Sequence, residues 1–101
     1  MPSYELSTEA EFDLEEITEY TYKKHGAVQT LKYIDGLEEN AHNLASSHGH
    51  YKELLQIHPN LRMKHYQHHY IFGIIKENKP MLIIAILHER MKIVARLKKR
   101  L

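Results

Sequence analysis

The strongest constraint on the fold is a run of seven apolar residues, Met81 to Leu87, which is followed by His88, Glu89 and Arg90. The run is far shorter than the roughly 20 residues that a membrane span needs, and its branched side chains favour a β-strand. Because its apolar character is nearly continuous, we expect the strand to be buried on both faces. This makes residues 81–88 the most buried strand of the predicted fold.

Three further segments are predicted to be strands. Residues 61–66 alternate in polarity, and residues 69–76 are rich in β-branched and aromatic side chains. Short turns connect them to each other and to the apolar run, which predicts an antiparallel meander. Near the N-terminus, Tyr4 and Leu6 alternate with polar neighbours, so a short strand is expected there as well.

Two helices are expected between residues 7 and 46. Ser7 or Thr8 begins the first, with Thr8 and Glu11 in capping-box spacing, and Gly26 ends it. The short connection to the second helix predicts an antiparallel helical hairpin. Small and apolar side chains recur at steps of three and four on one face of each helix: Ala10, Leu14, Ile17 and Thr21 in the first, and Leu31, Ile34, Leu37, Ala41 and Leu44 in the second.

Together these elements predict one α+β two-layer domain spanning residues 1–101. Its order is an N-terminal strand, a helical hairpin that covers one sheet face, a three-stranded antiparallel meander and a short C-terminal helix. The chain has 43% hydrophobic and 27% charged residues, which is ordinary for a soluble globular protein. Cysteine is absent, which excludes disulfides and thiolate metal sites and fits the cytoplasm, and we see no signal peptide.

Charge is distributed very unevenly along the chain, although the formal net charge is only +1. Residues 9–19 carry six acidic side chains and no basic one, whereas residues 90–101 carry six basic side chains and no acidic one. Such a contrast favours an acidic or nucleic-acid partner for the basic end. The alternative is that the two ends of the chain lie close together and partly neutralise each other.

Histidine is frequent, with nine residues, and such side chains can bind a metal ion or act as an acid or base. His65, His68 and His69 cluster near the first meander turn, but neighbouring strand side chains alternate between faces, so we expect no metal site and no cofactor. His88 closes the apolar strand at the rim of the sheet. There it could act as an acid or base near neutral pH, or it could only cap the strand, which is the role we favour.

The segments "YELSTEAEFDLEEITEYT", "HYIFGIIK" and "ILHERM" resemble the ParE branch of the RelE/ParE superfamily of bacterial toxins. This resemblance implies the toxin of a type II toxin–antitoxin pair, which inhibits DNA gyrase without being an enzyme and so blocks replication. It also implies a cognate antitoxin that is small, acidic and partly disordered, and that can form a hetero-oligomer with the toxin. No membrane partner is implied.

The related RelE branch cuts mRNA on the ribosome, and its nucleases typically place an aromatic residue near the C-terminus to stack on the target base. In this chain no Phe, Tyr or Trp follows Phe72. A ribosome-dependent endoribonuclease therefore remains the alternative, with His88 as acid/base and with Arg90 and Arg62 binding phosphate. One departure from the ParE pattern is Lys92, where the family often has an acid.

The resemblance and the charge pattern together predict two contact regions in the C-terminal third. The predicted target-binding residues are His88, Arg90, Arg96, Lys98 and Arg100. On the expected C-terminal helix, Met91, Val94, Leu97 and Leu101 share one face. The first three of these, Met91, Val94 and Leu97, either bind the antitoxin or pack onto the protein's own sheet, and the sequence leaves both possibilities open.

Overall fold

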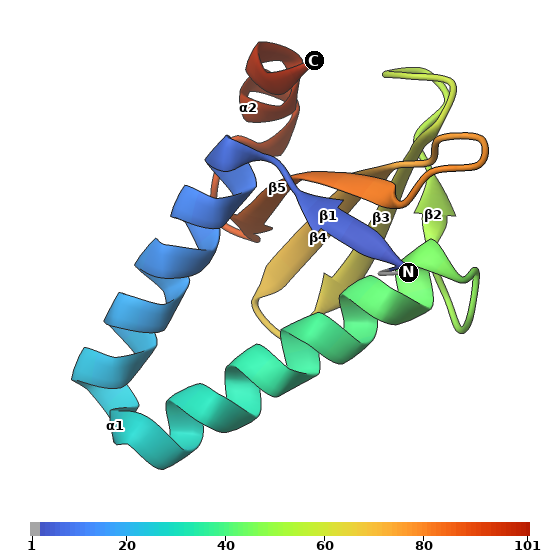
Figure 1. Cartoon of the computed structure of the whole chain (residues 1–101). Coiled ribbons are helices and arrows are strands. Elements are labelled where there is room, and N and C mark those ends of the chain that lie inside the picture. The colour runs from blue at the N-terminus through green and yellow to red at the C-terminus, as the bar shows by residue number, and fades with distance from the viewer. Residues whose placement is uncertain (1–2) are drawn as a thin grey trace.

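The computed structural model of the chain describes residues 3–101 and contains five strands in one sheet, with helices packed against it (Figure 1). In chain order the elements are β1 (Tyr4–Leu6), α1 (Thr8–Ala45), β2 (Lys52–Glu53), β3 (Leu61–Tyr66), β4 (His69–Ile74), β5 (Met81–His88) and α2 (Ile93–Arg100). The predicted α+β architecture, with its N-terminal strand and short C-terminal helix, is confirmed. Within residues 3–101, no helix is long and apolar enough to span a membrane.

The strands are ordered β1-β5-β4-β3-β2 across the sheet. The predicted meander is present, because β4 pairs antiparallel with both β3 and β5. At one edge β1 runs parallel to β5, with Tyr4 opposite Met81 and Leu6 opposite Ile83. At the other edge lies β2, which the sequence did not predict because its two residues are exposed and show no alternation.

Both faces of β5 are buried, as its apolar run predicted. On one face, Ile83 and Ile86 join a core that α1 covers, and on the other face Ala85 and Leu87 join a second core to which α2 contributes. The register between β4 and β5 shifts at Ile84, because Phe72 pairs with Ala85 while the next residue of β4 pairs with Ile83. This bulge exchanges the faces that successive side chains occupy and leaves backbone groups of β5 without a ladder partner.

The helix α1 is two helical arms joined at Gly26, which has a φ of 81° and breaks the regular geometry. The arms splay into a V whose elbow projects beyond the sheet (Figure 1). Ser7 is the N-cap, and its Oγ accepts a hydrogen bond from Ala10 N at 3.1 Å, so the capping box predicted from Thr8 is wrong. Leu31, expected in the buried stripe, is 65% exposed near the elbow, where the sheet offers it nothing to pack on.

Candidate docking surface at the end of β5 and on α2

His88 is the last residue of β5 and lies half-buried, paired with His69 of β4. Its Nδ1 accepts a hydrogen bond from the backbone N–H of Arg90 at 3.1 Å, and its carbonyl accepts one from Met91 N at 3.0 Å. These two bonds hold the chain in a tight turn and leave the Arg90 side chain in solvent. The geometry is that of a side chain that shapes the β5–α2 connection.

Glu89 connects this turn to the β3–β4 turn. Its backbone N–H donates to the carbonyl of His68 at 2.9 Å, and its two carboxylate oxygens lie 3.6 Å from His65 Nε2 and His68 Nδ1. These contacts strengthen when the imidazoles are protonated. In the part of the chain that the structure describes, no group of three His, Asp or Glu side chains is placed to hold a metal ion.

His69 points away from the other two turn histidines and towards α1. Its Nδ1 lies 2.5 Å from the hydroxyl of Tyr33, and its ring contacts that of His88 edge-on at 5.2 Å. The pKa of His69 is lowered to about 4, chiefly by burial and in smaller part by the positive charges that His88 and His68 can carry. His69 is therefore neutral at neutral pH, where it joins the second arm of α1 to the sheet.

The helix α2 packs on β5 through one face and presents the other to solvent. Leu97 is fully buried in the core below the helix, and Ile93 packs beside it. Met91, Val94 and Leu101 are exposed instead, at 36%, 51% and 47%. The predicted shared face is therefore wrong for Leu97, which packs onto the protein's own sheet, whereas Met91 and Val94 remain available to a partner.

Arg100 joins α2 to both α1 and β5. Its guanidinium donates to both carboxylate oxygens of Asp13, with Nη2 at 2.9 Å from Oδ1, and to the carbonyl of Ile84 at 3.0 Å. The Asp13 carboxylate also accepts the backbone N–H of Ile86 at 2.9 Å, and Glu9 lies 3.5 Å from Arg100 Nε. The pKa of Arg100 is raised, chiefly by its hydrogen bonds to Asp13. Because β1 pairs with β5 only as far as Ile83, the edge of β5 beyond Ile83 has no strand partner. There the Asp13 carboxylate accepts the Ile86 N–H and the Arg100 guanidinium donates to the Ile84 carbonyl, so both backbone groups are hydrogen-bonded.

This contact removes Arg100 from the set of accessible cations. Its side chain is only 14% exposed and is held by the protein's own acids, so the expectation that Arg100 faces a target is wrong for this structure. The pairing of Arg100 with Asp13 was not predicted from the sequence. One signal was present, because Asp13 lies between Ala10 and Ile17 on the helix face predicted to be buried, where a carboxylate needs a partner.

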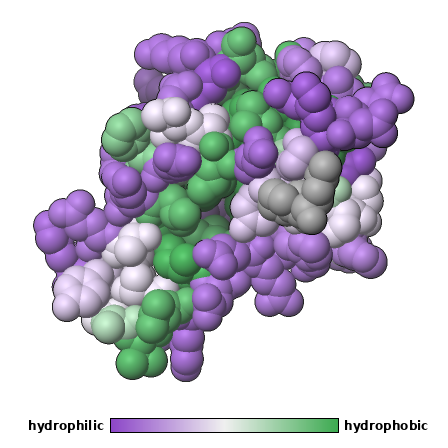
Figure 2. Space-filling model, in the orientation of Figure 1, coloured by the Kyte–Doolittle hydropathy of each residue, from purple (hydrophilic) through white to green (hydrophobic). Residues whose placement is uncertain are grey.

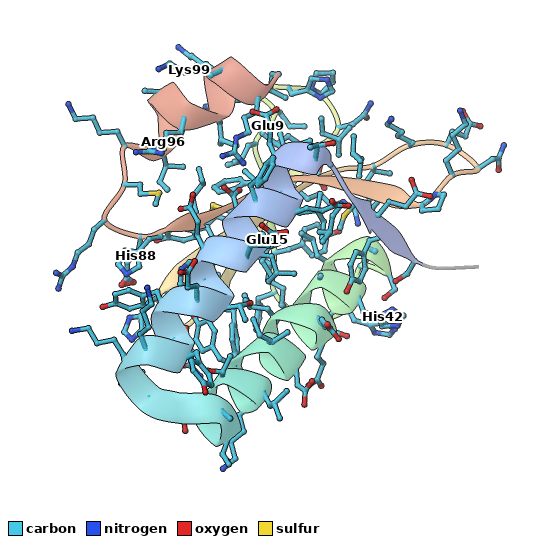
Figure 3. The ribbon with its side chains drawn as sticks, turned by 60° about the vertical axis from the view of Figure 1, so that its left-hand side comes forward. Glu9, Glu15, His42, His88, Arg96 and Lys99 are labelled. Atoms are coloured by element: carbon cyan, nitrogen blue, oxygen red, sulfur yellow. The ribbon has the colours of Figure 1, made fainter. Side chains whose placement is uncertain are left out.

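Five cations of the C-terminal segment remain exposed: Arg90, Lys92, Arg96, Lys98 and Lys99. Within residues 3–101, none of the five takes part in an ion pair with another side chain. Figure 3 shows Arg96 and Lys99 on the outer side of α2, while His88 lies at the far end of the connecting turn. The basic end of the chain is thus a cationic surface, and Arg100 alone reaches the acidic segment of α1.

Two cations of β3 are not part of that surface. Arg62 donates to the carbonyl of Leu44 at 3.1 Å and to Ser47 Oγ at 2.7 Å, so it fixes the C-terminal end of α1. Lys64 is buried and donates to the carbonyl of His50 at 2.9 Å. Both side chains hold the fold together and are not displayed to a ligand.

The residues of the ribonuclease alternative are not brought together. Arg62 pairs with Gly73 at one end of β4, whereas His88 pairs with His69 at the other end. Arg90 lies near His88, but Arg62 is remote from both and is already bonded within the fold. The prediction that Arg62 and Arg90 clamp one phosphate beside His88 is therefore wrong.

Two sequence comparisons relate this chain to known proteins. The family model described as "ParE toxin of type II toxin-antitoxin system, parDE" matches residues 4–93. A curated relative, "Toxin ParE" from Escherichia coli, is 43% identical over 101 residues, which cover all of this chain and 98% of the relative.

The chain belongs to the ParE toxin family. It is therefore the toxin of a type II toxin–antitoxin pair, and its partner is an antitoxin protein. The family model matches the strands, α1 and the β5–α2 turn, but it stops at Ile93, where α2 begins. Hence the cationic side chains of α2 lie outside that match, although the relative from E. coli aligns with them.

Proposed function

We propose that this ParE-family toxin inhibits DNA gyrase by binding through the cationic surface of α2 and the β5–α2 turn, without breaking a covalent bond itself. The observation that carries the proposal is the exposure of five unpaired cations, among the described residues, in ten consecutive positions, Arg90 to Lys99. Inhibition of this kind needs a shaped binding surface but no catalytic groups, and the toxin would block replication by occupying gyrase.

The chemistry of the surface suits a target that contains DNA or acidic protein groups. Arg90 and Arg96 carry planar guanidinium groups, which bind phosphate and carboxylate in a bidentate manner, and lysines such as Lys98 add positive charge. The nearby His88 holds the turn through its bond to Arg90 N, so we assign it a positioning role and not an acid/base role. The α2 segment is itself fixed in place by Leu97 and Arg100.

The antitoxin is proposed to cover the apolar part of the same region, in the cytoplasm where gyrase acts. Met91 and Val94 are exposed next to the cations, so a small, acidic and partly disordered antitoxin would find apolar contact and opposite charge together. A segment that folds on binding needs both, because it must offset the entropy lost on ordering. Such an antitoxin would neutralise the toxin by covering its gyrase-binding surface, as a toxin–antitoxin hetero-oligomer.

A supercoiling assay with purified gyrase tests the proposal. We expect the native toxin to inhibit supercoiling. The Arg90→Glu/Arg96→Glu variant should need at least about tenfold higher concentration for the same inhibition, which corresponds to ~1.4 kcal/mol of lost binding free energy. The control, Lys52→Glu/Lys76→Glu, makes the same change in net charge at exposed positions on β2 and just after β4. It should inhibit like the native toxin.

Two results would overturn the proposal. One is a native toxin that leaves supercoiling unaffected at every concentration tested. The other is an equal loss of inhibition in the cationic-surface variant and in its control, which would mean that net charge alone matters. Primer extension on mRNA from cells that express the toxin examines the ribonuclease alternative separately, because new 5′ ends that depend on the toxin would support it.

A further inference from the structure

The elbow of α1, residues 20–32, carries a group of exposed apolar side chains. Nine large apolar side chains are exposed within residues 3–101, and four of them lie in these thirteen residues: Tyr20, Tyr22, Val28 and Leu31. Val28, at 71%, is the most exposed of the nine. In Figure 2 the hydrophobic surface reaches the tip of the elbow, which projects beyond the sheet. Such a group on a projecting tip is typical of a surface that another macromolecule covers.

The same segment is basic, although the first arm of α1 before it carries six acidic side chains. Residues 20–32 contain no acidic residue and four basic or titratable ones: Lys23, Lys24, His25 and Lys32. Lys24 Nζ lies 5.8 Å from the ring centroid of Tyr20, and Lys23 pairs with Glu19 at 3.2 Å. Both side chains of that pair are exposed, so the pair is weak and does not prevent Lys23 from binding another acid.

The elbow has a fixed shape. Gly26 turns the chain with a φ of 81°, which glycine adopts at no steric cost, and Thr30 Oγ1 donates to the Gly26 carbonyl at 2.7 Å. Thr21 Oγ1 donates in the same way to the Ile17 carbonyl at 2.7 Å, and both threonines are buried. Because these contacts hold the backbone on either side of Gly26, the tip loses little entropy when it binds a partner.

The elbow is separate from the cationic surface of α2. Figure 1 shows the two at opposite ends of the first arm of α1. Asp13, which binds Arg100 of α2, precedes Gly26 by 13 residues, or about 20 Å of helix at 1.5 Å per residue. This exceeds the Debye length of roughly 8 Å at physiological salt, so each basic surface attracts a partner independently of the other.

We propose that the elbow is a second docking site for gyrase, an inference that rests on the function proposed above, and that its apolar tip occupies a hollow with an acidic border on the gyrase protein. The aliphatic side chains of Val28 and Leu31 favour protein over DNA, because a duplex takes in such groups by unstacking its bases. A hollow on a protein removes them from water without that cost, and its acidic border pairs with the lysines. The toxin then holds gyrase at two points, so each contact strengthens the other.

Two elbow variants test this contact, in the supercoiling assay and in direct binding to gyrase without DNA. Val28→Gln/Leu31→Gln removes the apolar tip, and Lys24→Glu/Lys32→Glu reverses two charges, all at exposed positions. Each variant should need an at least about tenfold higher concentration for half inhibition, and its dissociation constant for DNA-free gyrase should rise by a similar factor. Because the two variants alter different chemistry, misfolding of one leaves the other as the test.

Matched controls separate the elbow contact from general effects of charge and hydrophobicity. Phe12→Gln/Leu55→Gln removes two exposed apolar side chains that lie outside the elbow and α2. Lys52→Glu/Lys76→Glu makes the same change in net charge at exposed positions of the sheet region. Both controls should inhibit and bind gyrase like the native toxin, and a loss equal to that of the elbow variants would overturn the proposal.

The remaining outcomes distinguish this inference from the proposed function. A native toxin without effect on gyrase would overturn both. If the native toxin inhibits, Arg90→Glu/Arg96→Glu is weakened and the elbow variants are not, the elbow contact alone is overturned. Elbow variants that bind DNA-free gyrase like the native toxin but inhibit less would assign the elbow to DNA. Elbow variants that sediment differently from the native toxin without gyrase would assign it to a second copy of the toxin. Either result would also overturn the proposal.

Discussion

Replacement of Asp13 by alanine should destabilise the toxin by about 3 kcal/mol, because one carboxylate satisfies three donors. Two of its hydrogen bonds are charge-assisted bonds from Arg100, and the third is from the backbone N–H of Ile86. The acceptor of all three bonds is a charged carboxylate, and hydrogen bonds to charged groups contribute about 1.5–3 kcal/mol each. Both side chains of the pair are slightly exposed, at 14% and 13%, so water recovers part of that sum.

The assay is urea unfolding followed by far-ultraviolet circular dichroism, since the chain contains no Trp. A loss of this size corresponds to a fall in Tm of roughly 12–20 °C for a domain of about 100 residues. Glu9→Ala is the matched control. Its side chain is 62% exposed and touches the same guanidinium, so its loss should cost no more than about 0.5 kcal/mol.

A double-mutant cycle decides whether the pair itself is responsible. Asp13→Ala, Arg100→Ala and the double variant should give a coupling energy of at least ~1.5 kcal/mol, because each single change leaves a half-buried charge without its partner. Arg100→Lys should recover less than half of the loss, since an ammonium cannot bond both carboxylate oxygens and the Ile84 carbonyl at once. A coupling energy near zero would refute the reasoning that this pair fastens α2 to α1.

Three further predictions concern single sites. His69 has a folded pKa of about 4 against 6.5 when unfolded, so between these values the unfolded chain binds more protons and the stability rises with pH. After a discount for partial exposure, we expect the free energy of unfolding, measured with urea, to fall by ~1–2 kcal/mol as the pH falls from 7 to 4. The fall should be smaller in His69→Asn. An equal pH dependence of both proteins would contradict this. A Cβ at Gly36 would overlap the Tyr66 hydroxyl. Gly36→Ala should therefore destabilise the toxin by about 1–2 kcal/mol in the same assay. In a Tyr66→Ala background the same change should be neutral or stabilising, because alanine favours a helix more than glycine does. His88→Asn keeps an acceptor for Arg90 N and should retain gyrase inhibition, whereas His88→Ala should weaken it several-fold; equal activity loss in both variants would point to acid/base chemistry.

Local patterns in the sequence predicted the main elements well. The run from Met81 to Leu87 identified the strand that both cores share, and the glycine at position 26 marked the break between the two arms of α1. In the first arm, the spacing of Ala10 and Ile17 identified the buried face. These features depend on neighbouring residues and on burial, and burial produces a periodic pattern of apolar residues in the sequence.

The predictions that were wrong concern residues whose contacts are distant in the sequence. Arg100 looked like one more exposed cation, but its partner Asp13 is 87 positions away. Arg62 likewise alternated as an exposed strand residue, yet it bonds the end of α1. Leu31 fitted the apolar stripe of its helix, but the elbow of the V carries it past the sheet, and Thr30 and Tyr33 are buried instead. Sequence periodicity does not indicate which part of a helix extends beyond the sheet.

The parallel pairing of β1 with β5 has a consequence for the order of events during synthesis. β1 is the first strand made and β5 the last, so the β1–β5 edge of the sheet forms only when nearly the whole chain has been translated. At about 5–20 residues per second, this leaves several seconds in which the nascent polypeptide exists without its finished surface. Because such distant pairings also fold slowly, the toxin acquires its complete sheet later still.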